Sequence, residues 1–405
     1  MRFCLVHPSD PWGVKIGGAE VFARGLLRHA PPWVTLSMIG VESATTQHTC
    51  GQWQNRQFEG RTIDFLPLLK APAESDGDAS PLSLRFTVAL LSSRINWEGC
   101  SLLFNRIEPA LVRTPGARLR AAVVHNDVQA QIEGPGSDVR WRHIPRMYRR
   151  VERHVFHRLD RIFVVHQPTA SDYRKRYSQI ADRFTFLPTW FEPDLFKPAS
   201  RPKEAIRLDL EKRHPGLNAS DRWVLFCGRL DQQKNPLGLI NAFIRVLQTM
   251  PELQLLLVGE GLLLDQIKQK ISRYPKRILW LGKQPHESLP AYYQAADVFL
   301  LASHYEGMPL TVLEALACGL PVAATPAGEI PNIIQPGRHG EISADFSVEA
   351  LACTLHTALM RLQTYHAEAC THAVASFIPS VIVAHLFQTL QTPGMPVRSN
   401  EESSP

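Results

Sequence analysis

Two glutamates stand out in the segment SHYEGMPLTVLEALACG, residues 303–319, because nearly every other residue of its second half is uncharged. Pro309 fits the first position of a helix and Gly319 fits its end, so Glu306 is expected in a loop and Glu314 inside the helix. Burying a lone carboxylate costs free energy unless a partner hydrogen-bonds to it. Glu314 therefore either faces water or meets a polar ligand.

One elongated ligand could reach both carboxylates. At a rise of 1.5 Å per residue, Glu314 lies ~7–8 Å down the helix that is expected to begin at Pro309. Carboxylates accept hydrogen bonds from hydroxyl groups, and a nucleotide sugar carries hydroxyls at both ends, on its hexose and on its ribose. The backbone N–H groups of Gly307, Met308 and Leu310 would be available to phosphate or sugar oxygens at the same place.

Two cations mark a second candidate site. Gly228 ends the apolar run WVLFC, Arg229 follows at once, and Lys234 comes shortly before a helix expected to begin near Pro236. Cations beside a helix N-terminus are unfavourable with respect to the helix dipole unless an anion lies between them. Two solvated surface cations are the alternative, but that interpretation does not require them at the carboxyl end of a strand. The pattern favours an anion site.

The third candidate is Gly17-Gly18-Ala19-Glu20, which follows the first expected strand and opens a helix. Two glycines let backbone N–H groups approach an anion closely at the positive end of the helix. A plain turn explains the two glycines equally well.

The elements that position these residues predict two α/β domains. Short apolar runs alternate with helical patterns in both halves of the chain, which indicates parallel, doubly wound sheets. Ligands of such sheets bind beyond the carboxyl ends of the strands. A polar stretch with several prolines between Lys197 and Arg222 predicts a domain boundary. We expect an N-terminal domain at 1–198, a C-terminal domain at 199–375, a helix at 376–392 that crosses back to the N-terminal domain, and a disordered tail at 393–405.

Composition limits the class of protein. Of the 405 residues, 44% are apolar and 20% charged, as expected for a soluble protein of two domains. Seven scattered cysteines without a C-x-x-C pair predict the reducing cytosol and not a disulfide framework. No run approaches ~18 apolar residues, so no membrane-spanning helix is expected.

Positive charge is concentrated in the first half of the chain. Residues 1–200 hold 26 Lys and Arg against 19 Asp and Glu, whereas residues 201–405 hold 18 against 19. The segment 138–176 alone holds eleven against four. A membrane surface, an acidic glycan or nucleic acid would be attracted, and a solvated helix face is the alternative. Nucleic acid ranks last, because no aromatic-rich strand or helix-turn-helix pattern accompanies the arginines.

Taken together, the motifs resemble the retaining glycosyltransferases of family 4. Their GT-B fold consists of two facing Rossmann-like domains with parallel sheets and a deep interdomain cleft. The resemblance spans residues 1–392 and is strongest in 222–342. It rests on the three motifs above and on LLLVGEG, LGKQPHESLPAYYQAADVFLLAS, ATPAGEIPNII and the E-x7-E pair.

The resemblance implies a role for each motif. It places Glu314 on the ribose hydroxyls of the donor and Glu306 on the donor sugar, and it places Arg229 and Lys234 on the diphosphate. His125, in VVHND at a strand exit, corresponds to the family's active-site histidine beside the sugar. The predicted catalytic residues are His125, Arg229, Lys234 and Glu306. The predicted donor-binding residues are Gly17, Gly18, Gly228, Arg229, Lys234, Gly282, Glu306, Gly307, Met308, Pro309, Leu310 and Glu314.

The same resemblance implies the reaction. The substrate would be a nucleotide-diphosphate sugar, UDP- or GDP-linked rather than ADP-linked, and its configuration would be retained. Two cations and helix N-termini would stabilise the departing diphosphate without a metal or cofactor. The tripeptide Asp76-Gly77-Asp78 lies in a polar loop and is interpreted as a chance match to a metal motif. Thr189-Trp190 stands where the family often has Asn-Gly, which leaves the detail between the domains open.

The acceptor is not fixed by these motifs. The basic N-terminal half favours peripheral contact with an anionic inner leaflet and a glycan or lipid-linked acceptor, as in bacterial envelope polysaccharide or lipopolysaccharide synthesis. A soluble sugar phosphate or secondary metabolite is the alternative, and a catalytically degenerate nucleotide-binding scaffold is the non-enzymatic one. A Rossmann oxidoreductase is disfavoured, because no G-x-G-x-x-G follows the first strand.

Overall fold

The computed structural model describes residues 1–13, 17–43, 49–71, 81–125 and 143–391. Its described parts form two compact units. Unit 1 takes in Met1–His125, Ile144–Pro188 and the chain from Pro379 on, and unit 2 takes in Thr189–Ile378. The tripeptide at 76–78 and the predicted tail at 393–405 lie outside the described residues.

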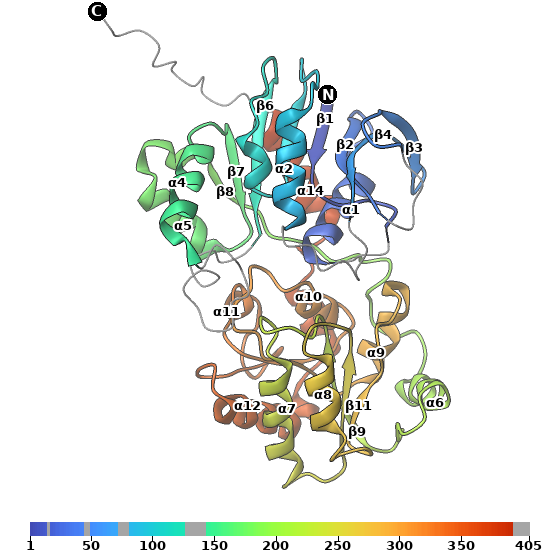
Figure 1. Cartoon of the computed structure of the whole chain (residues 1–405). Helices are drawn as coiled ribbons and strands as arrows, with labels where there is room; N and C mark the ends of the chain where they lie inside the picture. Colours follow the sequence, from blue (N-terminus) through green and yellow to red (C-terminus); the bar gives the residue numbers. More distant parts are fainter. Residues whose placement is uncertain (14–16, 44–48, 72–80, 126–142, 392–405) are drawn as a thin grey trace, which may run out of the picture. The chain divides into compact units, whose positions relative to one another are not determined.

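Unit 1 is built on an eight-stranded sheet with the order β3-β4-β2-β1-β5-β6-β7-β8 (Figure 1). All neighbouring strands pair in parallel except β3 with β4, which pair antiparallel. The strands are β1 (Arg2–Val6), β2 (Thr35–Glu42), β3 (Gln54–Phe58), β4 (Arg61–Lys70), β5 (Ser101–Phe104), β6 (Leu119–Val124), β7 (Arg161–Val164) and β8 (Phe184–Phe186).

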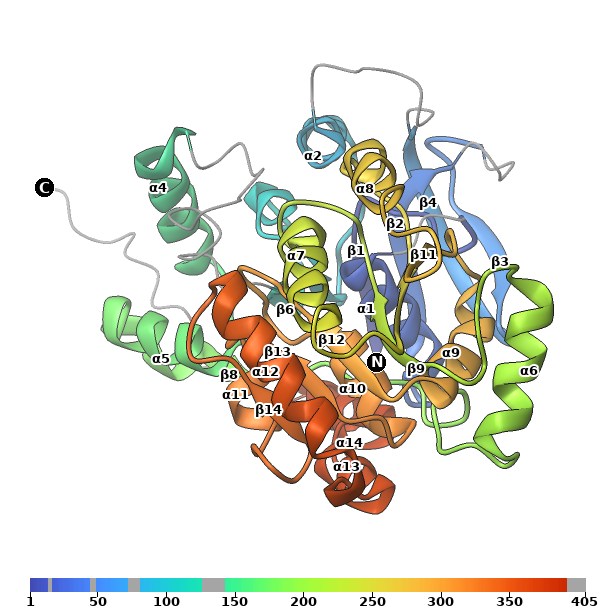
Figure 2. The same ribbon diagram turned by 90° about the horizontal axis from the view of Figure 1, so that it is seen from below.

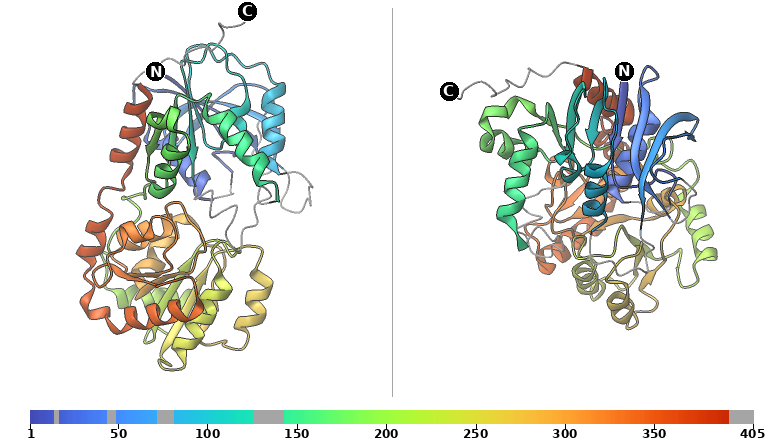
Figure 3. Two further views of the ribbon diagram at one scale, coloured as in Figure 1. Left: turned by 90° about the vertical axis from the view of Figure 1, so that its left-hand side faces the viewer. Right: turned by 45° about the horizontal axis from the view of Figure 1, so that its top comes forward.

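Helices cover both faces of this sheet (Figure 3). On one face α1 (Gly18–His29) packs beside α14 (Pro379–Gln391), and the ring of Phe387 meets that of Phe3 on β1 at 5.0 Å. The last helix of the chain therefore belongs to the first unit. The other face carries α2 (Leu82–Ser92), the short η1 (Glu108–Leu111), α4 (Pro145–Phe156), α5 (Gln167–Arg176) and η3 (Ser178–Arg183). This division follows from right-handed crossovers that run in opposite directions from the centre of the sheet.

Unit 2 holds a six-stranded, wholly parallel sheet with the order β11-β10-β9-β12-β13-β14. Its central strands are mostly apolar, and every residue of β10 (LQLLLV), Gln254 included, is buried. Such continuous burial is expected where helices cover both faces. The strands are β9 (Arg222–Cys227), β10 (Leu253–Val258), β11 (Ile278–Trp280), β12 (Val298–Leu301), β13 (Val322–Ala324) and β14 (Gly340–Ile342).

The helices of unit 2 are divided in the same way (Figure 2). One face is covered by α7 (Pro236–Leu247), α8 (Leu264–Ile271) and α12 (Val348–Met360), of which α7 and α12 lie side by side. The other face carries α6 (Lys203–Arg213), α9 (Leu289–Ala295), α10 (Leu310–Ala317) and α13 (Ala367–Ala373). Short segments η4 (His286–Ser288), α11 (Ile330–Ile333) and η5 (Leu362–Thr364) complete the unit.

The predicted fold class is confirmed: both halves are doubly wound α/β units, and every strand pair except β3 with β4 is parallel. No helix in the described ranges is both long and apolar enough to cross a membrane.

Candidate active site

In unit 2 the loops that follow β9 and β12 lie next to each other, because these strands are neighbours in the sheet. Gln233 ties the loops together. The side-chain amide of Gln233 donates to the backbone carbonyl of Tyr305 at 3.1 Å. The backbone carbonyl of Gln233 accepts from the N–H of His304 at 2.9 Å. The cations of the first loop and the carboxylate of the second are thereby brought to one place.

Lys234 and Glu306 meet at this place. The Lys234 Nζ donates to Glu306 Oε1 at 2.6 Å, and both side chains are mostly buried. Arg229 lies beside them and is more exposed. Its guanidinium contacts Asp231 at 2.7 Å and donates to Gln233 Oε1 at 2.9 Å. The two predicted phosphate-binding cations therefore stand at the same strand exits, each held by an acidic or amide group of the protein.

Glu314 does not face water: only 5% of it is exposed. The Tyr293 hydroxyl donates to its Oε2 at 2.9 Å, and His286 Nε2 lies 3.4 Å from its Oε1. Burial alone would lower the pKa of His286, but the hydrogen bond and the charge of Glu314 outweigh it and raise this pKa above its usual value. Each carboxylate oxygen has a second lone pair, so Glu314 can still accept hydrogen bonds from a ligand.

The start of α10 differs slightly from the expectation. Pro309 precedes the first helical residue, Leu310, whereas the predicted end holds, with Gly319 just past the helix at a φ of +80°. Pro309 O accepts from the N–H groups of Val312 and Leu313, which leaves the N–H of Leu310 outside the helical ladder. A free N–H at the positive N-terminal end of a helix is well placed to donate to an oxygen of an anionic ligand.

A neighbouring glycine supports the loop of Glu306. Gly328 has a φ of +56°, and a Cβ at this position would lie 2.3 Å from the carbonyl oxygen of Gly307. Glu329 N–H donates to that same carbonyl at 2.9 Å. Only a residue without a side chain fits here, so the loop after β13 fixes the backbone of Gly307 and Met308.

Two other predicted glycines also occupy strand exits of unit 2. Gly228 follows β9 with a φ of +155°, and Gly282 lies two residues after β11 with a φ of +75°. The Gly282 carbonyl accepts from Gly259 N–H at 2.9 Å, which joins the exits of β10 and β11. Trp190, which stands where the family often has glycine, belongs to unit 2, and 2% of it is exposed.

In unit 1 the predicted glycines open α1, with Gly17 at its N-cap and Gly18 as its first residue. The N-terminus is already beside an anion, because Glu20 Oε2 lies 2.5 Å from where a Cβ of Gly17 would be.

His125 directly follows β6, and Asn105 directly follows the neighbouring β5. The Asn105 amide donates to Ala19 O at 3.0 Å, so its oxygen faces His125 Nε2 at 2.6 Å. His125 Nε2 must then carry a proton, and Nδ1 is left as an acceptor. His125 is half-buried, and its removal from water, together with the nearby His7 and Arg106, lowers its pKa to about 3. His125 is therefore neutral at neutral pH.

His7 was not predicted from the sequence, although it follows β1 as His125 follows β6. It is 1% exposed, neither ring nitrogen has a hydrogen-bond partner among the described residues, and Nε2 lies 3.8 Å from Glu20 Oε1. The strands β1, β5 and β6 are adjacent, so His7, Asn105 and His125 leave the sheet at one edge. Sequence reasoning also missed the partners of Glu314, Tyr293 and His286. His7 carried the signal of a polar residue directly after a buried apolar run, whereas Tyr293, inside α9, and His286, in η4, carried no such signal.

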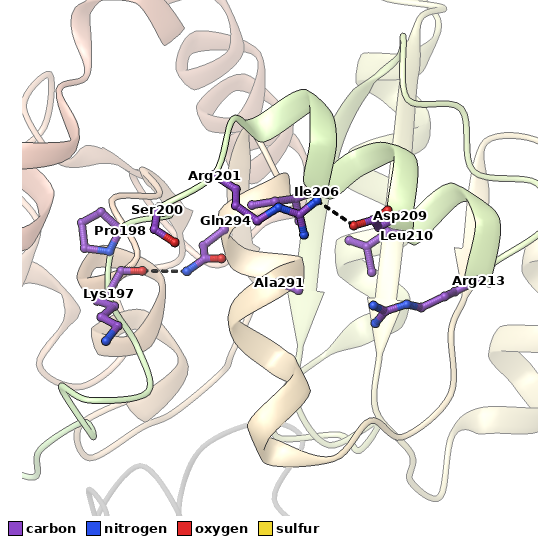
Figure 4. A pocket seen from close by; sticks show the side chains of 10 residues that line it. All are labelled: Lys197, Pro198, Ser200, Arg201, Ile206, Asp209, Leu210, Arg213, Ala291 and Gln294. Atoms are coloured by element: carbon purple, nitrogen blue, oxygen red, sulfur yellow. Dashed lines mark hydrogen bonds and ion pairs between the residues drawn. The ribbon is translucent and has the colours of Figure 1, made fainter.

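One pocket of unit 2 lies apart from the predicted site residues (Figure 4). It has a volume of about 270 Å³ between α6, α9 and the segment before α6. An ion pair between Arg201 and Asp209 at 2.9 Å crosses it, and the Gln294 amide donates to Lys197 O at 2.8 Å. None of the residues predicted to bind the donor lines this pocket.

The comparison with known proteins finds a family match within unit 2. Residues 209–366 match the family model described as "Glycosyl transferases group 1". This part of unit 2 is therefore similar to the group 1 glycosyltransferases. The match contains Arg229, Lys234, Glu306 and Glu314, and it ends before α13.

Curated relatives match mainly over the same part of the chain. The D-inositol 3-phosphate glycosyltransferase of Segniliparus rotundus is 31% identical over 178 residues, which are 42% of this chain and 38% of that protein. The GDP-mannose-dependent alpha-(1-6)-phosphatidylinositol monomannoside mannosyltransferase of Mycolicibacterium smegmatis is 28% identical over 63% of this chain and 64% of that protein. In the first three relatives, the matched part spans between 38% and 48% of the relative's length.

Solved structures resemble the fold over nearly the whole chain. Sucrose-phosphate synthase from Thermosynechococcus elongatus has a TM-score of 0.76 at 20% identity, covering 96% of this chain and 98% of that chain. Anabaena HepE in complex with UDP-glucose has a TM-score of 0.69 at 18% identity, covering 96% and 99%. At these identities the similarity establishes the GT-B fold alone.

Proposed function

We propose that the protein is a retaining glycosyltransferase that moves a hexosyl group from a nucleotide-diphosphate sugar to a hydroxyl of a glycan or lipid-linked acceptor. The observation that carries the proposal is the gathering of Arg229, Lys234 and Glu306 at two adjacent strand exits, with Glu314 on the helix that begins there. These groups match the diphosphate, the hexose and the ribose of one donor. UDP- or GDP-linked sugars are the proposed donors, because HepE was solved with UDP-glucose and the Mycolicibacterium relative is GDP-mannose-dependent.

The proposed reaction needs charge stabilisation at the leaving group. As the bond between the anomeric carbon and the diphosphate oxygen breaks, negative charge develops on the diphosphate, and Arg229 and Lys234 would stabilise it without a metal. Lys234 would exchange its contact with Glu306 for a phosphate oxygen. The freed carboxylate would then accept hydrogen bonds from the hexose.

Retention is proposed to follow a displacement on one face of the sugar. The acceptor oxygen forms its bond to the anomeric carbon on the face that the diphosphate leaves, and the acceptor proton passes to the departing phosphate oxygen. A neutral His125 cannot supply a positive charge, so it would orient the sugar by accepting a hydrogen bond from a sugar hydroxyl at Nδ1. Exclusion of water from the site would limit hydrolysis of the donor.

The biological setting is proposed to be the synthesis of a bacterial envelope polysaccharide or lipopolysaccharide in the cytoplasm. Escherichia coli relatives named as an O-antigen mannosyltransferase and as a galactosyltransferase acting on a diphosphoundecaprenol acceptor are 32% and 33% identical over about a third of this chain. All seven cysteines are free thiols, as is usual in a reducing compartment. A peripheral contact with an anionic membrane completes the proposal. A soluble acceptor is the alternative substrate.

A thermal-shift panel of nucleoside diphosphates and their sugars tests the donor. A true donor at 100 times its dissociation constant should add about 2.7 kcal/mol of stability. Mass spectrometry of the same mixtures, with and without lipid-linked acceptors, would then detect transfer or slow hydrolysis. Stabilisation without turnover of any sugar nucleotide would support the scaffold alternative, and absence of stabilisation by every nucleotide would refute the proposal.

A further inference from the structure

An exposed apolar stripe runs along α2 in unit 1. Leu84, Val88 and Leu91 are each more than half exposed. They recur at i, i+4 and i+7, so they lie in one row along the helix. The buried residues of α2 fall on the opposite side, which turns the apolar row away from the sheet.

A cationic stripe runs along α4 in the same unit. Arg146, Arg149, Arg150 and Arg153 are exposed, whereas the one acidic residue of the helix, Glu152, is 1% exposed. Glu152 accepts hydrogen bonds from the hydroxyls of two tyrosines of unit 1, so its charge is directed inward. The outer side of α4 is therefore basic.

Two further apolar side chains accompany the arginines. Ile144 and Met147, at the start of α4, are 44% and 49% exposed. Exposed large apolar residues that stand singly need no explanation, but a row of three beside a further pair marks an interaction surface.

The two stripes belong to helices on the same face of the sheet of unit 1. Both α2 and α4 pack against η1, so they lie on one face of the sheet (Figure 3). In each helix the exposed residues stand apart from the buried ones that pack toward the rest of unit 1. We call this surface, made of Leu84, Val88, Leu91, Ile144, Met147, Arg146, Arg149, Arg150 and Arg153, the α2–α4 face.

We propose that the α2–α4 face is the surface by which the protein lies on an anionic lipid membrane. Four arginines attract acidic headgroups, and the apolar rows bury their side chains at the boundary between headgroups and acyl chains. An acidic glycan or a nucleic acid would satisfy the arginines but would leave the α2 row in water. A second copy of this chain would bring the arginines of two α4 helices into the same contact, where they repel each other.

The α2–α4 face would be the site of the peripheral membrane contact in the proposed function, and this assignment rests on that contact. It does not depend on the identity of the donor. Binding at this face would raise the local concentration of the protein where a lipid-linked acceptor resides.

Co-sedimentation of the full chain with vesicles tests the proposal. We compare phosphatidylcholine vesicles with vesicles that also contain phosphatidylglycerol, at low and high salt. The protein should pellet with the anionic vesicles and not with the neutral ones, and added salt should weaken the binding because it screens exposed charges.

Two sets of substitutions divide the contributions. Arg146→Gln, Arg149→Gln and Arg150→Gln together should weaken binding to the anionic vesicles about a hundredfold, at about fivefold per arginine. Leu84→Gln, Val88→Gln and Leu91→Gln together should weaken it about tenfold or more. All six positions are exposed, so both variants should keep the wild-type Tm and the wild-type hydrolysis of any donor that the panel identifies.

Matched controls come from unit 2. Leu208→Gln with Met360→Gln removes two exposed apolar side chains, and Lys212→Gln with Arg213→Gln removes two exposed charges. Neither control should change vesicle binding. The proposal is overturned if the protein binds neutral vesicles equally well or does not bind anionic ones. It is also overturned if the control variants bind anionic vesicles as weakly as the α2 and α4 variants, or if the protein is a dimer in solution that the α2 substitutions convert to a monomer. Donor hydrolysis that persists in these cases leaves the proposed reaction standing.

Discussion

Replacing Glu314 by glutamine tests the ribose contact with the least change of shape. The carboxylate is buried and is already held by Tyr293 at 2.9 Å and by His286 at 3.4 Å. A glutamine keeps one oxygen that can accept the hydrogen bond from the tyrosine hydroxyl. The fold should therefore survive, with a loss of about 1 kcal/mol or less in the free energy of unfolding. The negative charge that would receive the ribose hydroxyls is lost.

The expected loss of affinity follows from the number of hydrogen bonds. A hydrogen bond to a charged group contributes about 1.5–3 kcal/mol and a neutral one about 0.5–1.5, so neutralising the acceptor costs about 1–1.5 kcal/mol for each hydroxyl. Two ribose hydroxyls give about 2–3 kcal/mol, which is about a 30- to 150-fold rise in the dissociation constant.

Isothermal titration calorimetry with UDP and GDP, and with their 2′-deoxy forms, measures this loss. The wild-type protein should bind the 2′-deoxy nucleotide more weakly, and Glu314→Gln should show a smaller penalty for the missing hydroxyl. Tyr293→Phe should weaken binding less than Glu314→Gln, because it loosens the carboxylate without removing its charge.

Unit 2 offers a matched control at Glu341. It is also buried and accepts hydrogen bonds from the Tyr365 hydroxyl at 2.8 Å and from Arg361 at 3.0 Å, but it has no predicted contact with the donor. Glu341→Gln should affect the free energy of unfolding and leave nucleotide affinity unchanged. Equal affinities for Glu314→Gln and wild type, or an equal loss in Glu341→Gln, would refute the assignment of Glu314.

Three further predictions concern the groups around this carboxylate and in unit 1. Lys234→Gln leaves Glu306 buried without its cation, so it should lower the free energy of unfolding by about 1–3 kcal/mol, which thermal melts measure. It should also weaken the binding of nucleoside diphosphates more than that of monophosphates, which calorimetry measures. Equal weakening of both would count against a phosphate contact. The raised pKa of His286 in the folded state means that its contribution to stability is present below its ordinary pKa of 6.5 and is lost as pH rises through the higher folded-state pKa; melts of wild type and His286→Gln should converge at alkaline pH, and parallel curves throughout would contradict this. The lowered pKa of His125, about 3, has the opposite effect on stability: the folded protein keeps this histidine neutral above about pH 3, so its stability falls as pH drops below 6.5. Replacing Asn105 by aspartate (Asn105→Asp) should raise the pKa of His125, and NMR should show the imidazole titrating closer to neutral pH. An unmoved titration would disprove the contact between the two residues.

The elements themselves could be predicted from the sequence because their signals are local. The two-domain parallel α/β architecture followed from apolar runs that alternate with helical periodicity. The end of α10 at Gly319 followed from the freedom of glycine at positive φ. Its start was off by one residue, because Pro309 has an extended backbone and serves as the residue before the helix.

The partners within the site could not be predicted, because sheet topology and not sequence distance brings them together. His7, Asn105 and His125 are far apart in the chain and meet only because β1, β5 and β6 are adjacent. Lys234 and Glu306 are 72 residues apart and meet because β9 lies beside β12. Each of these residues follows a buried strand, which the sequence does show, but strand order comes from tertiary structure.

The central claim is that Arg229, Lys234, Glu306 and Glu314 bind one activated sugar. Saturation-transfer NMR of the donor found in the thermal-shift panel tests it most directly, because the signal reports which protons of the ligand touch the protein. We predict saturation of both ribose and hexose protons in the wild type, a selective loss at the ribose in Glu314→Gln and a selective loss at the hexose in Glu306→Gln. Undiminished saturation of both sugars in both variants would contradict the claim.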